Sequence, residues 1–334
     1  MIIQFFVPLF LATVITLLIT PIGIRAARLF NLIDLPNSAP HKVHQHPVPK
    51  AGGLTIGLVV FILLLGSGKF FVADIRAILV ASLVIIIFGF VDDIKGLSAG
   101  WKLLGQLIAA VLLIQQDIHI RMFTNQILNI SITLFWIIGI TNAFNLVDSM
   151  DSLAVGLAAI AGAFFMIVTV DAGQLDLTYM SAILLGSCIG VFYFNVIPAQ
   201  TFLGDSGSQF LGFMLAALSI AYTPPNLPQT SSWFVPILLL SVPIFDTTFV
   251  VLSRLQRRLP IYQAGQDHTY HQLIRLGMSP IRAVTTMHIG AILASCLAFI
   301  ALPLPPFWAN VLFILALLCG LILLFWLQEI SRRE

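Results

Sequence analysis

The stretch that decides the fold is residues 75–96, IRAILVASLVIIIFGFVDDIKG, in which an apolar run ends in two adjacent carboxylates. The run is close to the roughly 20 apolar residues that a helix needs to cross a bilayer. Ten further runs of this kind occur, and 59% of the 334 residues are hydrophobic while only 9% are charged. Soluble domains carry roughly 25% charged residues, so a water-soluble, disordered or nucleic-acid-binding protein is almost excluded.

The apolar runs predict an all-α, polytopic membrane protein with eleven transmembrane helices, folded as a single integral membrane domain over residues 1–334. The expected spans are 3–24, 52–68, 75–91, 101–116, 130–147, 153–170, 178–197, 208–222, 233–253, 283–302 and 307–328. The run at 208–222 is short enough to be tilted or interrupted.

The basic residues predict which helix ends face the cytoplasm. With the N-terminus outside, Lys69, Arg76 and Arg121 fall outside, and the other 13 of the 16 Lys and Arg residues fall at cytoplasmic loops and helix ends. Cytoplasmic loops carry an excess of basic residues, which favours this orientation. The odd number of spans then puts the C-terminus in the cytoplasm.

Eight aspartates gather on or near the same predicted cytoplasmic face. They are Asp34, Asp92, Asp93, Asp148, Asp151, Asp205, Asp246 and Asp267. A carboxylate drawn to the centre of the bilayer costs up to ~2.5–3.5 kcal/mol, so such groups usually face a polar cavity or a partner. The set indicates a cation-binding site, although solvation in loops is the alternative for any single member.

The pair Asp92-Asp93 follows directly after an apolar run. Adjacent residues do not share a helix face, so the two carboxylates can serve different duties, such as a metal contact and a proton acceptor. Mg²⁺ prefers a few carboxylate oxygens together with waters and substrate phosphates. The alternative is that Asp92, Asp93 and Lys95 only mark the membrane boundary.

Four polar residues recur at intervals of three in Asn142-x-x-Asn145-x-x-Asp148-x-x-Asp151. One straight helix cannot aim all four at one point, so we expect a helix to end near Asp148. Asp148 would then cap the next helix, with Asp151 in its first turn. Asn145 and Asp148 would line a pocket on the cytoplasmic side, unless the motif only joins helices and caps one.

Residues 202–208, FLGDSGS, form a Gly-rich turn that leads into an apolar run. Such turns expose backbone N–H groups that suit anions, and Asp205 adds a cation site. A phosphate bridged by Mg²⁺ would satisfy both features. A plain helix cap is the alternative.

Two further loops carry histidines and basic residues. His41, Lys42, His44 and Lys50 precede Gly52-Gly53, and this cluster suits a polyphosphate or an anionic lipid headgroup. In the second loop, His268 and His271 follow three arginines, and together they could hold phosphate or position a metal-bound group. Those arginines are Arg254, Arg257 and Arg258. Plain positive-inside charge and solvated histidines are the alternatives.

Asp246 lies within the apolar run 233–253, where a carboxylate is costly without a partner. The sequence supports two roles for Asp246 equally: a structural pairing with another polar group, or a role in the predicted site.

Taken together and in this order, the motifs resemble those of the polyprenyl-phosphate N-acetylhexosamine-1-phosphate transferases of glycosyltransferase family 4. These share a superfamily with the phospho-N-acetylmuramoyl-pentapeptide transferases. The match is carried by His41-Lys42-x-His44 before Pro-x-Pro-x-x-Gly-Gly, Asp92-Asp93-x-Lys95-Gly96, Lys102-Leu-x-x-Gln106, the Asn142–Asp151 motif and Phe202-Leu-Gly-Asp205-Ser-Gly-Ser.

The resemblance implies a helical bundle in the bacterial inner (plasma) membrane with a cleft open to the cytoplasm. The implied reaction transfers HexNAc-1-phosphate, with GlcNAc as the favoured sugar, from a UDP-HexNAc to polyprenyl (undecaprenyl) phosphate and releases UMP. It would be the first membrane step of cell-surface polysaccharide synthesis. The implied cofactor is Mg²⁺, with Mn²⁺ as an alternative.

The resemblance also implies residue roles. Asp92 and Asp205 would hold the metal, Asp92 and Asp93 would handle the lipid phosphate, and His268 and His271 would stand for the family's catalytic histidine motif. The implied substrate-binding residues are Lys42, His44, Lys50, Lys95, Lys102, Asn142, Asn145, Asp148, Asp151 and Phe202, the last stacking on uracil.

The chain departs from the family pattern at several positions. Family members usually have glycine at the positions of Ser149 and Ser152, and histidine at the position of Tyr270. Serine lacks the freedom of glycine at positive φ, so we expect an altered pocket or sugar preference, or an altered or lost activity. An extended His-rich segment is missing, which argues against a peptide-bearing substrate.

Two other classes of protein compete with a transferase. A secondary transporter would show inverted repeats and charges near the bilayer midplane, and the sequence shows neither. A non-catalytic homologue that binds lipid headgroups is kept open by the serine substitutions. A homodimer is compatible with the sequence, and no nucleic-acid partner is expected.

Overall fold

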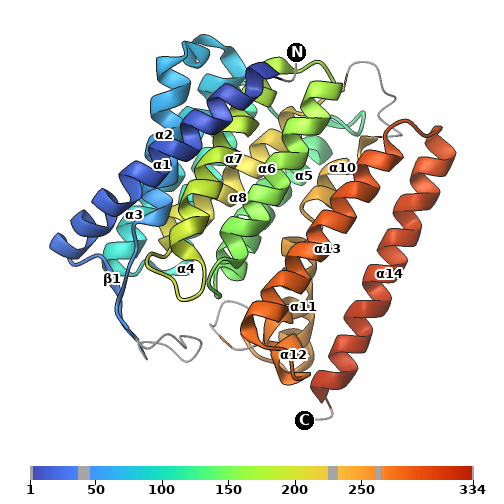
Figure 1. The fold of residues 1–334 in the computed structure, drawn as a ribbon. Helices are drawn as coiled ribbons and strands as arrows, with labels where there is room; N and C mark the ends of the chain where they lie inside the picture. The colour runs from blue at the N-terminus through green and yellow to red at the C-terminus, as the bar shows by residue number, and fades with distance from the viewer. Residues whose placement is uncertain (1–2, 37–45, 225–231, 261–264, 266, 333–334) are drawn as a thin grey trace.

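The computed structural model describes residues 3–36, 46–224, 232–260, 265 and 267–332. Long helices run side by side in a bundle, and the two chain ends lie at its opposite ends (Figure 1).

The longer helices are α1 (Ile3–Leu29), α2 (Gly52–Gly66), α3 (Ala73–Lys95), α4 (Ala99–Gln115), α5 (Gln126–Val147), α6 (Leu153–Asp171), α7 (Leu175–Asn195), α8 (Gly204–Ala221), α11 (Ser241–Gln256), α13 (Pro280–Ala301) and α14 (Pro306–Arg332). The short elements are η1 (Lys69–Phe71), α10 (Val235–Leu239), α12 (Thr269–Arg275) and the strands β1 (Ile33–Asp34) and β2 (Val48–Pro49). The strands pair antiparallel, with Ile33 opposite Pro49.

Seven helices of the described residues are long and apolar enough to cross a membrane: α1, α3, α5, α6, α7, α13 and α14. The helices α2 and α4 are apolar but shorter. The predicted all-α, polytopic class is confirmed. The count of eleven spans and their orientation remain predictions.

The structure differs from the expected spans in two places. The run at 208–222 is one unbroken helix, α8, which begins earlier at Gly204. The run at 233–253 is instead broken at Leu240, which ends α10 and precedes α11. Pro243 explains the break, because proline has no N–H to donate to the carbonyl four residues earlier, at Leu239.

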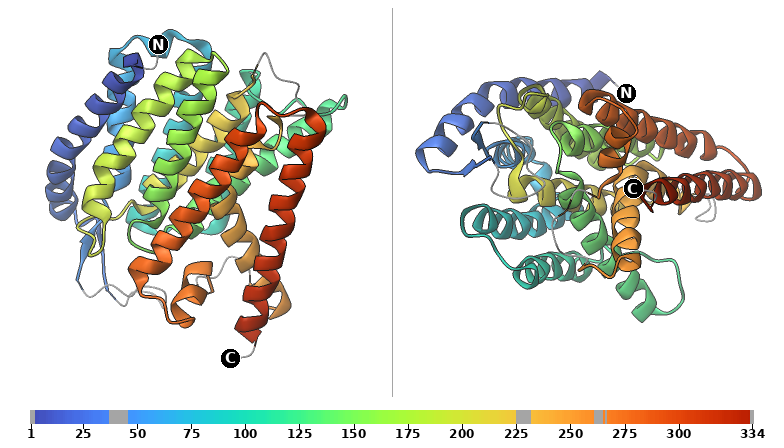
Figure 2. Two further views of the ribbon diagram at one scale, coloured as in Figure 1. Left: turned by 45° about the vertical axis from the view of Figure 1, so that its right-hand side comes forward. Right: turned by 90° about the horizontal axis from the view of Figure 1, so that it is seen from below.

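Helix α8 lies at the centre of the bundle and is buried along nearly its whole length, from Ser206 to Ile220. It packs against α2, α3, α5 and α6. By contrast, α14 lies at the edge of the molecule (Figure 2).

Glycines let α8 approach its neighbours closely. A Cβ atom added to Gly53 on α2 would lie 2.1 Å from the Cα of Gly207 on α8. A Cβ atom added to Gly89 on α3 would lie 2.5 Å from the Cα of Ser206. The first turn of α8 is thus wedged between α2 and α3, which places Asp205 beside the last turn of α3.

Candidate active site

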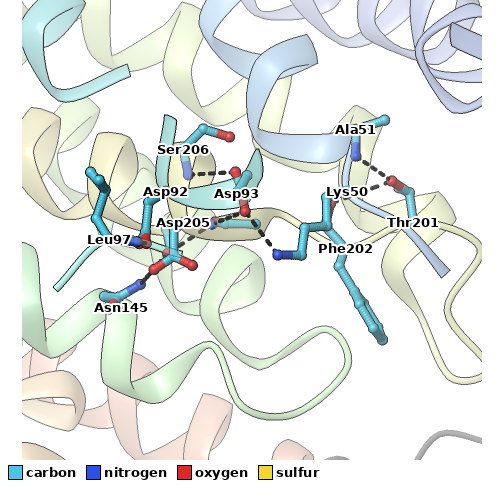
Figure 3. A network of polar contacts seen from close by, with 12 residues as sticks. Lys50, Ala51, Asp92, Asp93, Leu97, Asn145, Thr201, Phe202, Asp205 and Ser206 are labelled. Carbon is cyan, nitrogen blue, oxygen red and sulfur yellow. Dashed lines mark hydrogen bonds and ion pairs between the residues drawn. The ribbon is translucent and has the colours of Figure 1, made fainter. Parts of the chain in front are cut away.

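Polar side chains from five segments converge at one end of the bundle (Figure 3). Asp92 and Asp93 lie in the last turn of α3, and Asp205 lies in the first turn of α8. Asp92 and Asp205 both contact the Nζ of Lys102 near the start of α4, and the Asp205 Oδ1–Nζ distance is 2.9 Å. Two carboxylates from different helices therefore share one cation.

Asp93 is directed elsewhere, as expected for a residue adjacent to Asp92 on a helix. Its two carboxylate oxygens accept the backbone N–H groups of Asp205, at 2.9 Å, and Ser206, at 3.0 Å. Oδ1 also lies 3.2 Å from the Nζ of Lys50, which follows β2. The Asp93 side chain is fully buried.

Asn145 and Asn142 on α5 extend this network. Asn145 Nδ2 donates to Asp205 Oδ1 at 2.8 Å and to Ser208 Oγ at 2.9 Å. Asn142 exchanges hydrogen bonds with Gln106, which also donates to Gln209 at 3.1 Å. Gln209 is a member of this network that the motifs did not predict. Its place four residues after Asp205 on one helix was the available signal, because such residues share a face.

The turn between α5 and α6 differs from its prediction. Helix α5 ends at Val147, as expected, and Asp148 follows it. However, Ser152 occupies the N-cap position of α6 and makes no side-chain cap, so the expectations that Asp148 caps this helix and that Asp151 lies in its first turn were wrong. Asp151 Oδ2 instead accepts the N–H of Ala199 at 3.0 Å.

Ser152 adopts φ +64°, the left-handed conformation that glycine favours. Its N–H donates to Asn195 Oδ1 at 2.9 Å, and its hydroxyl donates to the Asp151 carbonyl at 2.6 Å. The turn therefore keeps a glycine-like backbone although serine replaces the family's glycine.

The carboxylates and lysines at this end of the bundle shift one another's pKa values. Burial raises the pKa of Asp148 well above its ordinary value, and the nearby charges of Asp205, Asp93 and Asp151 raise it further. Burial lowers the pKa of Lys50, but the Asp93 carboxylate outweighs this effect and the pKa is raised overall. Added positive charge would therefore be stabilised here.

The histidine loop forms a second cluster around Asp246 on α11. Asp246 is completely buried, and its Oδ2 lies 2.8 Å from His268 Nδ1 while Oδ1 accepts the N–H of Thr269 at 2.7 Å. The structure therefore favours the pairing role of Asp246. His268 itself is 4% exposed, so its ring is part of the packed interior.

His271 packs on Tyr270, with ring centroids 4.0 Å apart. Burial and the neighbouring His268 lower the pKa of His271 to about 4, so its ring is neutral near pH 7 and offers no positive charge to a phosphate. The Tyr270 hydroxyl donates to the carbonyl of Ser149 at 3.2 Å. Two residues that depart from the family pattern therefore connect the histidine loop to the Asp148–Ser152 turn.

Two of the three upstream arginines, Arg254 and Arg257, are directed at Asp267. Arg254 makes two hydrogen bonds of 2.7 Å with its carboxylate, and Arg257 makes one of 2.9 Å. Although burial raises the pKa of Asp267, these guanidinium groups outweigh it and lower the pKa overall. Arg254 is 3% exposed, so it is used within the fold rather than presented to a phosphate.

The remaining predicted residues differ in their placement. Phe202 pairs through its backbone with Pro49 and Gly52, at 2.9 Å each, and its ring points away from the carboxylates (Figure 3). Lys95 is exposed at the end of α3. His41, Lys42 and His44 lie outside the described residues.

The carboxylates of this site provide a few oxygen ligands for a divalent cation. Within the ranges that the structure describes, no group of three or more His, Cys, Asp or Glu side chains is placed to hold a metal ion by itself. Asp92 and Asp205 nevertheless converge on one cation, the Lys102 ammonium group. Mg²⁺ usually binds one or two carboxylates and completes its shell with waters and substrate phosphates. The residues therefore fit an ion that a substrate helps to hold.

The structure is thus a polytopic helical bundle of the membrane-protein class, with a cluster of acidic and basic side chains at one end. Residues 75–223 match the glycosyl transferase family 4. The chain belongs to this family, and the resemblance stated from the motifs is confirmed.

Similar proteins span most of the chain. It is 32% identical to a probable undecaprenyl-phosphate N-acetylglucosaminyl 1-phosphate transferase of Bacillus subtilis, over 92% of this chain and 88% of that protein. It is 29% identical to a decaprenyl-phosphate N-acetylglucosaminephosphotransferase of Mycobacterium tuberculosis, over 83% and 78%. It is also 31% identical to a phospho-N-acetylmuramoyl-pentapeptide-transferase of Streptococcus pneumoniae, over 72% and 79%.

Proposed function

We propose that this protein transfers HexNAc-1-phosphate, with GlcNAc as the first sugar to test, from a UDP-HexNAc to polyprenyl phosphate and releases UMP. The reaction would take place at the cytoplasmic edge of the bacterial inner membrane, with Mg²⁺ or Mn²⁺ as cofactor. The names of the Bacillus and Mycobacterium relatives support the lipid acceptor and the sugar phosphate.

One observation carries the proposal. Asp92 and Asp205 come from two helices that are far apart in the sequence, and both meet the ammonium group of Lys102. The cluster lies at the end of the bundle, where a lipid phosphate held in the bilayer and a soluble nucleotide sugar can both arrive. This position suits a reaction between one apolar and one charged substrate better than it suits transport through the midplane.

Phosphoryl transfer depends mainly on positioning and on neutralising charge. A bound Mg²⁺ would supply charge neutralisation between the two phosphate-bearing substrates. Lys50 and Lys102 add positive charge on either side of the carboxylates, at 20% and 25% side-chain exposure, so both are within reach of an incoming phosphate. Asn145 holds the Asp205 carboxylate in place through its 2.8 Å hydrogen bond.

The direct test is release of UMP from UDP-GlcNAc by the purified protein with undecaprenyl phosphate and Mg²⁺. We expect turnover by the wild-type protein and a loss of at least about 100-fold in Asp205→Asn, because a charge-stabilising group at a transferred phosphate is worth several kcal/mol. Asp176→Asn, at a partly exposed ion pair with Lys69, serves as the control. Absence of turnover with every UDP-HexNAc would contradict the proposal.

Orientation is tested by cysteine labelling in a background without the native cysteines. Ile94, at the carboxylate end of α3, is 55% exposed, and Phe71, at the end of η1 just before α3, is 81% exposed. We expect an impermeant reagent to label Phe71→Cys in intact spheroplasts and Ile94→Cys only after permeabilisation. The reverse pattern would place the site on the outer side.

A further inference from the structure

The two adjacent carboxylates at the end of α3 have different surroundings. Asp92 is nearly buried, with 3% of its side chain exposed, and its Oδ1 accepts the N–H of Leu97. Its Oδ2 contacts the Nζ of Lys102, and Lys102 also contacts Asp205; the Lys102 and Asp205 side chains are 25% and 26% exposed. Asp93 has a fully buried side chain, and its two oxygens are taken up by two backbone N–H groups and by Lys50. The two carboxylates therefore differ in their partners rather than in their burial: Asp92 directs one oxygen to a cation that reaches solvent, whereas both oxygens of Asp93 are engaged by the start of α8 and by Lys50.

The two N–H groups that Asp93 accepts belong to the first turn of α8. The first N–H groups of any helix lack partners within that helix, and a side chain at the N-cap position usually supplies one. In α8 the N-cap residue is Leu203, which has no side-chain acceptor. Asp93 therefore provides this cap from a different helix, with a carboxylate charge that suits the positive end of the helix dipole.

Gly204 shows that this contact is built into the fold. Its φ of +71° favours glycine, and an added Cβ atom would lie 2.7 Å from Asp93 Oδ2. The chain thus turns into α8 directly beneath the Asp93 carboxylate, and Asp205 is the next residue.

We propose that Asp93 is a positioning residue, which caps α8 from α3 and so fixes Asp205 toward Lys102 and Asn145, whereas Asp92 is the member of the pair that meets the ligand. The consequence for catalysis rests on the proposed function. The capping role does not, because it concerns contacts within the protein alone.

The capping role is tested by amide hydrogen exchange in the detergent-solubilised protein without substrate. In Asp93→Asn, one acceptor oxygen becomes an NH₂ group that cannot accept an N–H of the first α8 turn. We expect exchange in a peptide that covers residues 204–208 to become at least about tenfold faster, since hydrogen bonds to charged groups are among the stronger ones. Asp92→Asn is the matched control, and we expect it to leave this peptide unchanged.

The consequence for catalysis is tested by measuring UMP release against Mg²⁺ concentration. If Asp93 acts through Asp205, Asp93→Asn should raise the Mg²⁺ concentration for half-maximal rate by about 10–100-fold, the usual effect of removing a group that orients a metal ligand. It should also recover most of kcat at saturating Mg²⁺. Asp92→Asn should lose kcat at every Mg²⁺ concentration.

Unchanged exchange in Asp93→Asn would overturn the capping role. Faster exchange together with a kcat that no Mg²⁺ concentration restores would overturn the claim that Asp93 acts only through Asp205. If Asp93→Asn does not fold, Gly204→Ala disturbs the same contact from the α8 side and should also speed exchange. A wild-type protein without turnover would contradict the proposed function, while the exchange result would still decide the capping role.

Discussion

The carboxylate cluster at the start of α8 and the histidine cluster at α12 pair their acids in opposite ways. Asp92 and Asp205 share Lys102; the Lys102 and Asp205 side chains are 25% and 26% exposed, whereas that of Asp92 is 3% exposed. Asp246 accepts hydrogen bonds from His268 and Thr269, and all three residues are at most 6% exposed. Solvent reaches the first cluster through Lys102 and Asp205, whereas the second is closed to it, so the clusters should respond differently to substitution.

The largest expected effect is on stability at the closed cluster. Asp246→Asn keeps the size of the side chain but removes the charge that faces His268, and it should lower the free energy of unfolding by about 2–3 kcal/mol. Asp176→Asn is the matched comparison, because its ion pair with Lys69 is partly exposed and should be worth less than about 1 kcal/mol. If thermal unfolding shows equal losses of stability in Asp246→Asn and Asp176→Asn, burial does not distinguish the two carboxylates.

The next prediction concerns Mg²⁺ binding at the cluster of Asp92, Asp205 and Lys102. If a divalent cation takes the place of the Lys102 ammonium group, Lys102→Met should bind Mg²⁺ about fivefold more tightly, because one competing positive charge near the carboxylates is gone. The Mg²⁺ dependence of the unfolding temperature measures this change. Arg76→Met, on the exposed start of α3, should leave it unaltered. Weaker Mg²⁺ binding in Lys102→Met would show that the lysine helps to build the ion site.

A smaller effect is expected at the turn that joins the two clusters. Ser152 holds φ +64°, which is unfavourable for a residue with a Cβ atom, so Ser152→Gly should stabilise the protein by about 0.5–1 kcal/mol. Ser149→Gly, which is not in the left-handed region, should give no gain. A destabilised Ser152→Gly protein would mean that the hydroxyl bond to the Asp151 carbonyl outweighs the strain.

A separate effect concerns how stability changes with pH. His271 has a pKa of about 4 in the folded protein against an ordinary value of 6.5, so the unfolded chain binds more protons in between. Its contribution to stability is therefore present above about pH 6.5 and is lost as the pH falls toward 4. His271→Gln should flatten the fall in unfolding temperature over this window. An unchanged slope would assign the acid sensitivity to other groups.

Much of the fold and part of the site could be predicted from the sequence, for identifiable reasons. Apolar runs of helical length gave the polytopic all-α class, and the spacing of Asp92, Asn145 and Asp205 within motifs singled out residues that meet in space. The partners of Asp93 could not be predicted, because Lys50 and Ser206 are distant in the sequence and meet it only through helix packing. The left-handed Ser152 was also missed, because serine by itself does not indicate positive φ.

The backbone pairing between residues 49–53 and 202–203 has a consequence for how this protein can diversify. Phe202 is held by hydrogen bonds of 2.9 Å to Pro49 and Gly52, and Leu203 by one of 3.1 Å to Gly53, all through main-chain atoms. Main-chain contacts do not depend on which side chain a residue carries. Position 202 is thus a place where evolution or directed mutagenesis can exchange one side chain for another while the main-chain pairing is kept.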